Sequence, residues 1–426
     1  SGIQEYLKST FSAVFDPQSG DRFVTSESLF LDGWTRAIDL GLCRPLIFVP
    51  MKSGVLGRFR FRNHVEDFFL FIQSHEPLTL TKKIKVWQKS QLIKDDRERH
   101  INSRPILSAL ESLSPEVKMH WLARTSSDNS VAIQMCVAQC YEEQMGLDVP
   151  VRAKQIRDIF REYQRITWAL KYIVRVQRAH GTCDDFLLGG LEFLAEMREK
   201  LGVNRTYMDI CRIGGVAKNL TIGEVQRMKS WFSQLEAALQ KEVEKSSSIK
   251  SILKRYKGDG IIDMMTYDLN SWGGPIARSA GSVWDQRAFS KEWEHDELLD
   301  GSDKSNIERR QVSQSSISER LQSVLDCLWE SFRIVKHLLY KLDTNPLEKP
   351  RLNWADKIDG KPYFSGVEGA DGPVFSMLVN GQIVLSTNSM RNEFLARDLV
   401  ESLKFKNKKL LRSSLGLIPE EMGIDA

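Results

Sequence analysis

The sequence predicts an α+β protein with a central bundle of long helices, a small N-terminal antiparallel sheet and a C-terminal α+β portion. Short segments with apolar/polar alternation begin at residue 46, long stretches with helical spacing of apolar residues follow, and strand-like segments return after residue 350. We expect an N-terminal arm over 1–45, a small β domain over 46–95, a helical bundle over 96–345 and a C-terminal segment over 346–426.

Composition sets the first limits. With 426 residues, 42% of them apolar, the chain can bury a large core. Its formal charge of +4 is too small to indicate nucleic acid by itself. No apolar run approaches the roughly 20 residues of a spanning helix, so no membrane span is expected. The six cysteines lack paired spacing, which argues against structural zinc, an iron–sulfur cluster or a disulfide framework, and we predict no metal site.

Three segments predict the small β domain: 46–49 (LIFV), 55–61 (VLGRFRF) and 78–87 (LTLTKKIKVW). Three others predict long helices, because their apolar residues recur every three or four positions over 156–174, 228–239 and 321–339. Thr221 followed by Glu224 is typical of a capping box and predicts where the second of these helices begins. Long helices of this kind must bury their apolar stripes against one another, which favours a bundle.

The remaining segments are polar or short. Residues 288–316 are rich in charge and serine and are expected to form an exposed excursion. Asn380-Gly381 indicates a hairpin turn between the strand-like segments 372–379 and 382–387. The basic run 404–412 (KFKNKKLLR) is interpreted as a solvated helical end or a binding patch. Cys136 and Cys140 share one helix face and are expected in the core.

One stretch resembles a known family. Residues 274–287 (GPIARSAGSVWDQR) are similar to the motif G-P-x-x-R-x-S-G-x-x-W-D-x-R of the 49-kDa-type, quinone-site subunit of respiratory complex I, with Ala280 in place of the usual Ser. The glycines and the proline would fix a loop, and the arginines offer fork-shaped donors that Asp285 can anchor. The motif contributes these residues: Gly274, Pro275, Arg278, Trp284, Asp285 and Arg287.

Weaker matches follow the family's order. Residues 149–165 (VPVRAKQIRDIFREYQR) keep Arg157, Glu162 and Arg165 of a family segment, and residues 199–216 keep Arg205, Arg212, Gly214 and Gly215. Residues 367–381 resemble a family strand and keep Glu368, and 53–61 resemble a strand entry. The resemblance therefore covers about 48–400. It implies a distant relation to nickel–iron hydrogenase large subunits, although the region of their first metal-binding cysteine pair reads RTSSDN here, over 124–129.

The groups that the resemblance implies for quinone reduction are missing. The loop expected to carry two histidines contains Met51, Lys52 and Ser53; the tyrosine position falls near Pro115; the aspartate position falls at Ala179. Histidine suits proton-coupled reduction because its pKa lies near neutrality, and a hydrogen-bonded tyrosine can donate the second proton. We therefore expect a degenerate quinone site, no catalytic residue and no cofactor. His180, beside Ala179, is interpreted as a helix-end residue or a displaced substitute.

Two functions remain open. In the first, the chain is the 49-kDa-type subunit of a divergent mitochondrial NADH:ubiquinone oxidoreductase on the matrix side of the inner membrane, between the iron–sulfur subunit and the membrane arm. Its retained arginines and carboxylates would then form a structural ion-pair network. In the second, it is a catalytically silent paralogue acting as a scaffold in another mitochondrial assembly, where RNA is a possible partner of the basic runs 248–257 and 404–412. A removed transit peptide would fit the first residue, Ser1.

Overall fold

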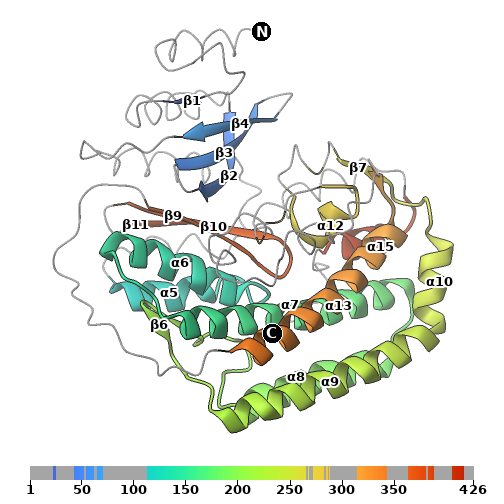
Figure 1. Cartoon of the computed structure of the whole chain (residues 1–426). Coiled ribbons are helices and arrows are strands. Elements are labelled where there is room, and N and C mark those ends of the chain that lie inside the picture. Colours follow the sequence, from blue (N-terminus) through green and yellow to red (C-terminus); the bar gives the residue numbers. More distant parts are fainter. Residues whose placement is uncertain are drawn as a thin grey trace.

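The computed structural model describes residues 23–24, 43–51, 54–61, 65–70, 113–264, 267, 272–282, 285, 287, 314–342, 363–379, 382–387 and 405–416. Within these ranges the chain forms a mostly helical body with a three-stranded sheet on one side and a second small sheet beyond it (Figure 1). The α+β class that the sequence predicts is confirmed at this level.

The helices account for most of the described chain. Their bounds are α5 Pro115–Ala123, α6 Ser130–Met145, α7 Val151–His180, α8 Asp185–Lys200, α9 Ile222–Lys245, α10 Ser247–Arg255, α12 Gly274–Arg278, α13 Ile317–Lys341 and α15 Lys408–Ser414. The three long helices predicted from spacing are confirmed as parts of α7, α9 and α13.

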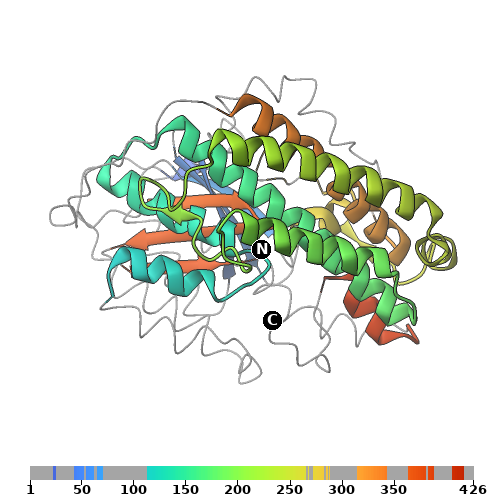
Figure 2. The same ribbon diagram turned by 90° about the horizontal axis from the view of Figure 1, so that it is seen from below.

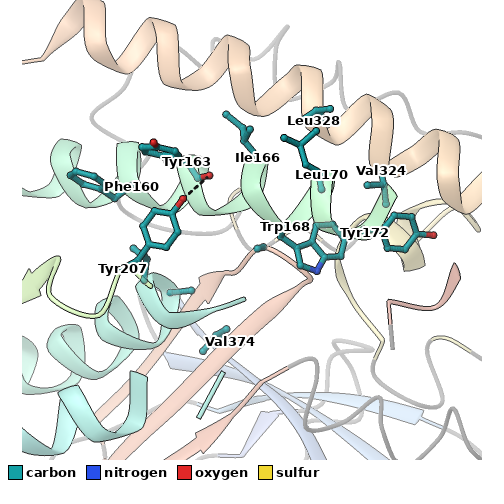
Figure 3. Packing of buried hydrophobic residues seen from close by; sticks show 14 of the residues in the cluster. Phe160, Tyr163, Ile166, Trp168, Leu170, Tyr172, Tyr207, Val324, Leu328 and Val374 are labelled. Atoms are coloured by element: carbon teal, nitrogen blue, oxygen red, sulfur yellow. Dashed lines mark hydrogen bonds between the residues drawn. The ribbon is translucent and has the colours of Figure 1, made fainter. Parts of the chain in front are cut away.

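Helix α7 is the centre of the molecule. α13 runs along it, α8 and α9 lie together on one side of the body, and α6 lies between α7 and the sheet of β9–β11 (Figures 1 and 2). Aromatic and aliphatic side chains of α7 and α13 fill the space between these elements (Figure 3). Phe232 of α9 joins the layers, with its ring 5.0 Å from that of Tyr163 and 6.2 Å from that of Phe332.

Two of the long helices begin at complete capping boxes. The Thr221 hydroxyl accepts from the backbone N–H of Glu224, whose carboxylate accepts from the backbone N–H of Thr221, as predicted. Ser316 and Glu319 repeat the arrangement at the start of α13. Each box satisfies backbone donors that the first turn of a helix cannot pair internally.

The N-terminal sheet has the strand order β1-β4-β3-β2. Its strands are β1 Phe23–Val24, β2 Cys43–Met51, β3 Gly54–Phe61 and β4 Val65–Leu70. The first two predicted strands correspond to β2 and β3, which are antiparallel as expected. The third, over 78–87, lies outside the described residues, and β4 is the strand that pairs with β3. β1 shows strand pairing inside the predicted arm, parallel to β4.

The C-terminal sheet has the order β11-β10-β9, with β9 Tyr363–Glu368, β10 Pro373–Val379 and β11 Gln382–Ser386. β10 and β11 pair in antiparallel register from Val379 with Gln382 onward, which fits a turn at 380–381. α6 packs against β9 and β10, and the Cys136 thiol donates to the Val374 carbonyl oxygen at 3.1 Å. Cys136 and Cys140 are fully buried, so the prediction that they belong to the core is confirmed.

Two short hairpins complete the described chain. β5 Cys211–Arg212 pairs with β6 Gly215–Val216, and β7 Ile262–Asp263 pairs with β8 Gln314–Ser315. The expected exposed excursion over 288–316 is therefore too long at its C-terminal end, because Ser315 is buried and Ser316 caps α13. In the part of the chain that the structure describes, no helix is both long and apolar enough to cross a membrane.

Candidate functional site

The predicted quinone positions are spread over the fold. Met51 is the last residue of β2, where its backbone pairs with Gly54 of β3, while Lys52 and Ser53 lie outside the described residues. Pro115 is the first residue of α5, and Ala179 is the second-last residue of α7. These elements come from different parts of the molecule (Figure 1).

Pro115 and Ala179 are not neighbours. Glu116, next to Pro115, contacts Arg212 and the backbone of Ile213, and the same hairpin binds Arg157 near the start of α7. Arg157 and Ala179 are separated by roughly 33 Å along α7 at 1.5 Å per residue. The assignment of these positions to one degenerate quinone site remains a prediction.

His180, beside Ala179, faces a polar partner at the end of α7. Its Nδ1 lies 3.0 Å from the Tyr256 hydroxyl, and the two rings meet edge to face with centroids 5.4 Å apart. Burial, and then the positive charge of Arg255, lower the pKa of His180. The imidazole is therefore neutral at physiological pH, as a helix-end histidine packed on tyrosine would be.

The motif over 274–287 forms a tight support beneath the C-terminal sheet. Gly274 adopts φ +73°, and a Cβ built on it would lie 2.1 Å from the carbonyl oxygen of Asp371, in the turn between β9 and β10. Gly273 is similarly close to Pro373. Only glycine fits both the left-handed conformation and this contact, so the glycines set how α12 meets the sheet. Trp284 lies outside the described residues.

A series of connected ion pairs, most of them buried, joins α12 to the partly exposed Glu330 of α13. Nη1 of Arg278 contacts Glu368 Oε1 at 3.1 Å and Asp285 Oδ2 at 2.8 Å. Asp285 also accepts from Nε and Nη2 of Arg287, and Nη2 reaches Glu330 at 2.9 Å. Asp285 and Glu368 are each 1% exposed, so these charge-assisted bonds lie in a region of low dielectric.

Helix α7 contributes the other half of this cluster. Glu162, which has no exposed surface, pairs with Arg165 at 2.5 Å and lies 3.9 Å from Nη1 of Arg287. Arg165 also donates to the backbone carbonyl oxygens of Glu368 and Gly369. The guanidinium of Arg165 therefore ties α7 to the end of β9, and we call this whole set of charged groups the charge cluster.

Electrostatics keep two of its carboxyl groups, those of Asp285 and Glu162, ionised. Burial alone would raise the pKa of Asp285, but the guanidinium groups of Arg287 and Arg278 hold that pKa far below its usual range. Burial opposes ionisation of Glu162 in the same way, and Arg165, Arg287 and Arg161 together lower its pKa. Each anion is thus stabilised by several fixed cations.

Arg157, expected in the same network, pairs instead with Glu142 of α6. Its Nη2 lies 2.5 Å from Glu142 Oε1 and also donates to the carbonyl oxygens of Arg212 and Gly215, while Glu142 accepts from the backbone N–H of Gly214. These bonds fix the β5–β6 hairpin on α6 and α7. Gly214 itself adopts φ +80°, which explains why glycine occupies the tip.

Two partners of these arginines were not predicted from the sequence. Glu142 and Glu330 lie on helices α6 and α13, whose apolar residues give a stronger pattern than the carboxylates beside them. The sequence did contain a signal for these two glutamates, because a carboxylate on the buried face of a helix needs a cation beside it. Among the residues that the structure describes, no group of three or more His, Cys, Asp or Glu side chains is placed to hold a metal ion.

The arrangement is therefore a rigid, charge-paired core between α7, α12, α13 and β9. Its guanidinium groups already bind carboxylates and carbonyl oxygens, so they are positioned to hold the fold together. The chemistry that such a cluster performs by itself is proton binding and fixed electrostatic support.

Sequence comparison supports the resemblance to the 49-kDa-type subunit family. The profile described as "Respiratory-chain NADH dehydrogenase, 49 Kd subunit" matches residues 187–367, from α8 to β9. That range contains the whole motif over 274–287 and the β5–β6 hairpin, whereas Glu162 and Arg165, which complete the charge cluster, lie upstream of it.

Individual relatives agree with the profile. The chain is 28% identical over 223 residues to a subunit of the NADH-quinone oxidoreductase of Gluconacetobacter diazotrophicus, covering 50% of this chain and 51% of the relative. It is 26% identical over 156 residues to "NADH-ubiquinone oxidoreductase 49 kDa subunit, mitochondrial" of Neurospora crassa, covering 36% and 33%. It is 28% identical over 192 residues to "NADH dehydrogenase [ubiquinone] iron-sulfur protein 2" of Nicotiana sylvestris, covering 43% and 48%.

These matches span between a third and about half of each relative's length. The profile match includes the glycine-rich support and the charged motif that the structure places at its core. The profile match and these relatives together support a divergent 49-kDa-type subunit of respiratory complex I as the protein that this chain most resembles in sequence.

Proposed function

We propose that this chain is a structural 49-kDa-type subunit of a mitochondrial NADH:ubiquinone oxidoreductase, held on the matrix side of the inner membrane between an iron–sulfur subunit and the membrane arm. In this role it supports the assembly without reducing quinone itself. Mitochondrial relatives of the family support the compartment.

The proposal rests on a contrast between the quinone-site positions and the charged motif residues. The positions expected to supply quinone chemistry contain Met51, Lys52, Ser53, Pro115 and Ala179, in place of the histidines, tyrosine and aspartate that the family resemblance implies. In contrast, the charged motif residues are present and paired in the buried core. A subunit that keeps its ion pairs and lacks its proton donors is suited to holding partners in place.

A second candidate is a silent paralogue that serves as a scaffold in another mitochondrial assembly. One observation favours it: Lys250, Lys254, Arg255 and Lys257 are exposed on or just beyond α10, and none has an ion-pair partner among the described residues. Such a basic face would bind an anionic partner, RNA included. Salt-dependent retention of RNA on the purified assembly would distinguish this candidate.

The test is capture of the native protein from detergent-solubilised mitochondria. Mass spectrometry of stoichiometric partners would be combined with an assay for NADH:quinone activity. The proposal expects complex I subunits in the capture, and activity in the assembly that survives replacement of Met51 by another apolar residue. Capture with unrelated partners would favour the paralogue, and covalent labelling beside Ala179 by a quinone analogue would contradict a silent site.

A further inference from the structure

The charge cluster contains more negative than positive groups. It contains the guanidinium groups of Arg165, Arg278 and Arg287 and the carboxyl groups of Glu162, Asp285, Glu330 and Glu368. Arg161 contacts Glu162 and pairs with Asp158, so we now count this further ion pair of α7 with the cluster. With every one of these described groups ionised, the cluster therefore carries one more negative than positive charge. Burying an excess charge is costly enough that a buried group usually takes up a proton instead.

The contacts indicate which carboxyl group takes the proton. Asp285 accepts from Arg278, from two nitrogens of Arg287 and from the backbone N–H of Arg287. Glu162 lies against three guanidinium groups, those of Arg165, Arg161 and Arg287. Both acids are therefore strongly stabilised as anions.

Asp158 and Glu330, at the two ends of the cluster, each contact a guanidinium group. Asp158 lies 2.8 Å from Nη2 of Arg161. The Glu330 side chain is 24% exposed and is bound by Arg287, so water and a cation both solvate it. Each of these two carboxyl groups therefore has a guanidinium group beside it.

Glu368 is placed differently. Its Oε1 shares one nitrogen of Arg278 with Asp285 Oδ2, and that nitrogen is closer to Asp285, at 2.8 Å against 3.1 Å. Two carboxyl groups on one nitrogen are within about 6 Å of each other, where one ionised group disfavours ionisation of the second. Since Asp285 has the stronger cationic surroundings, Glu368 is the group that this repulsion affects.

We infer that Glu368 is a buried proton-binding site, which carries a proton at neutral pH and makes the charge cluster electrically balanced. The neutral carboxyl group still accepts from Arg278 through its carbonyl oxygen, and its O–H adds a donor. The positive and negative charges of the cluster are then equal in number.

The electrostatic surroundings agree with this assignment. Burial, followed by the negative charge of Asp285, raises the pKa of Glu368, although Arg278, Arg165 and Arg287 act in the opposite direction. Cys327 of α13 faces the same groups, and burial raises the pKa of its thiol to about 11, so it adds no charge near neutral pH. The charged groups around Glu368 thus come from α7, α12, α13 and the 285–287 turn.

A raised pKa has a defined effect on stability. The folded state holds a proton that the unfolded state has released once the pH exceeds the ordinary glutamate value. Stability therefore falls as the pH rises from that value through the raised pKa of Glu368. Glu368→Gln removes this dependence of stability on pH, because glutamine is neutral at every pH and has nearly the shape of the protonated acid.

Matched amide substitutions in the full chain test the inference by urea unfolding at neutral pH. Glu368→Gln should leave the unfolding equilibrium constant within about threefold of the wild type. Asp285→Asn should raise it by roughly two to three orders of magnitude, as expected for breaking a buried ion pair. Glu162→Gln, at a second anionic position, should behave like Asp285→Asn.

Infrared spectroscopy of the wild-type chain gives a readout that does not depend on variant folding. A carbonyl stretch of a protonated, buried carboxyl group should be present at neutral pH and absent from the Glu368→Gln spectrum. The inference is overturned if the band is missing in the wild type, if it persists in Glu368→Gln, or if Glu368→Gln unfolds as readily as Asp285→Asn.

Discussion

At the scale of single residues, glycines decide how the motif meets the sheet. Gly274 has a positive φ and lies in backbone contact with Asp371, a combination that a side chain cannot enter without moving main-chain atoms. The sequence marks this residue only as part of a glycine-proline pair. The close approach of the β9–β10 turn explains why glycine fits this position.

The first prediction concerns this residue. Gly274→Ala should lower the free energy of unfolding by at least about 1–3 kcal/mol, because the new methyl group meets the Asp371 carbonyl and the backbone is strained. Gly189→Ala is the matched control. Gly189 lies inside α8 with open space around its Cα, so alanine there should raise stability by about 0.5–1 kcal/mol. Chemical denaturation of both variants measures the difference, and equal effects would contradict the contact.

At the scale of elements, the start of α9 shows how local sequence specifies a helix end. Thr221 and Glu224 satisfy each other's backbone donors, and Glu224 also contacts the Lys218 ammonium at 2.8 Å. All of these partners lie within six positions of one another in the chain. The capping box was therefore predictable from spacing, whereas a pair such as Arg287 with Glu330 was not.

The second prediction follows from Glu224. Its burial acts to raise its pKa, but Lys218 and the backbone and hydroxyl of Thr221 together lower the pKa to about 2. An acid with a lowered pKa in the folded state stabilises the protein above its ordinary value of about 4.3 and loses that contribution as the pH falls. Glu224→Gln should therefore be less stable than the wild type at about pH 7, and the difference should vanish as the pH approaches about 2. Urea unfolding of both proteins across this pH range measures the difference, and a gap that stays constant with pH would contradict the ionic cause.

The third prediction tests the other half of the same box. Thr221→Ala should destabilise the chain by about 0.5–2 kcal/mol, because the N–H of Glu224 loses its acceptor. Thr221→Ser keeps the hydroxyl and should stay close to the wild type. Thermal unfolding at neutral pH measures both, and equal losses for Ala and Ser would show that the hydroxyl bond is not the cause.

At the scale of the whole molecule, α7 joins the helical body to the sheet and to α15. Trp168 is 1% exposed, and its ring lies 5.6 Å from that of Tyr172 (Figure 3). Tyr172 donates to the carbonyl oxygen of Ser414 at the end of α15. A change here affects several layers at once, because interiors are close-packed.

The fourth prediction is that Trp168→Ala destabilises the whole chain by about 3–5 kcal/mol, through lost burial and the cavity left behind. Tyr340→Ala is the control: its side chain is 80% exposed at the end of α13, and its loss should cost no more than about 0.5–1 kcal/mol. Unfolding can be followed by several spectroscopic probes. If each probe reports the same single transition, shifted by the same amount in Trp168→Ala, then the described body unfolds as one unit.

Features that depend on near neighbours in the chain were predictable from the amino-acid order. Apolar spacing located α7, α9 and α13, and a threonine and a glutamate predicted the start of α9. A contiguous motif indicated the family resemblance that the profile match supports. These signals are local because helix periodicity and capping depend on residues three or four positions apart.

Which charges meet, in contrast, is a property of the folded chain. Glu368, Arg278 and Glu162 come from three segments that are far apart in the sequence, and no local pattern states that they share one buried cluster. The same holds for Arg157 of α7, which pairs with Glu142 of α6. Side-chain pairing across a core depends on how helices cross and pack, and that geometry is set by the whole fold.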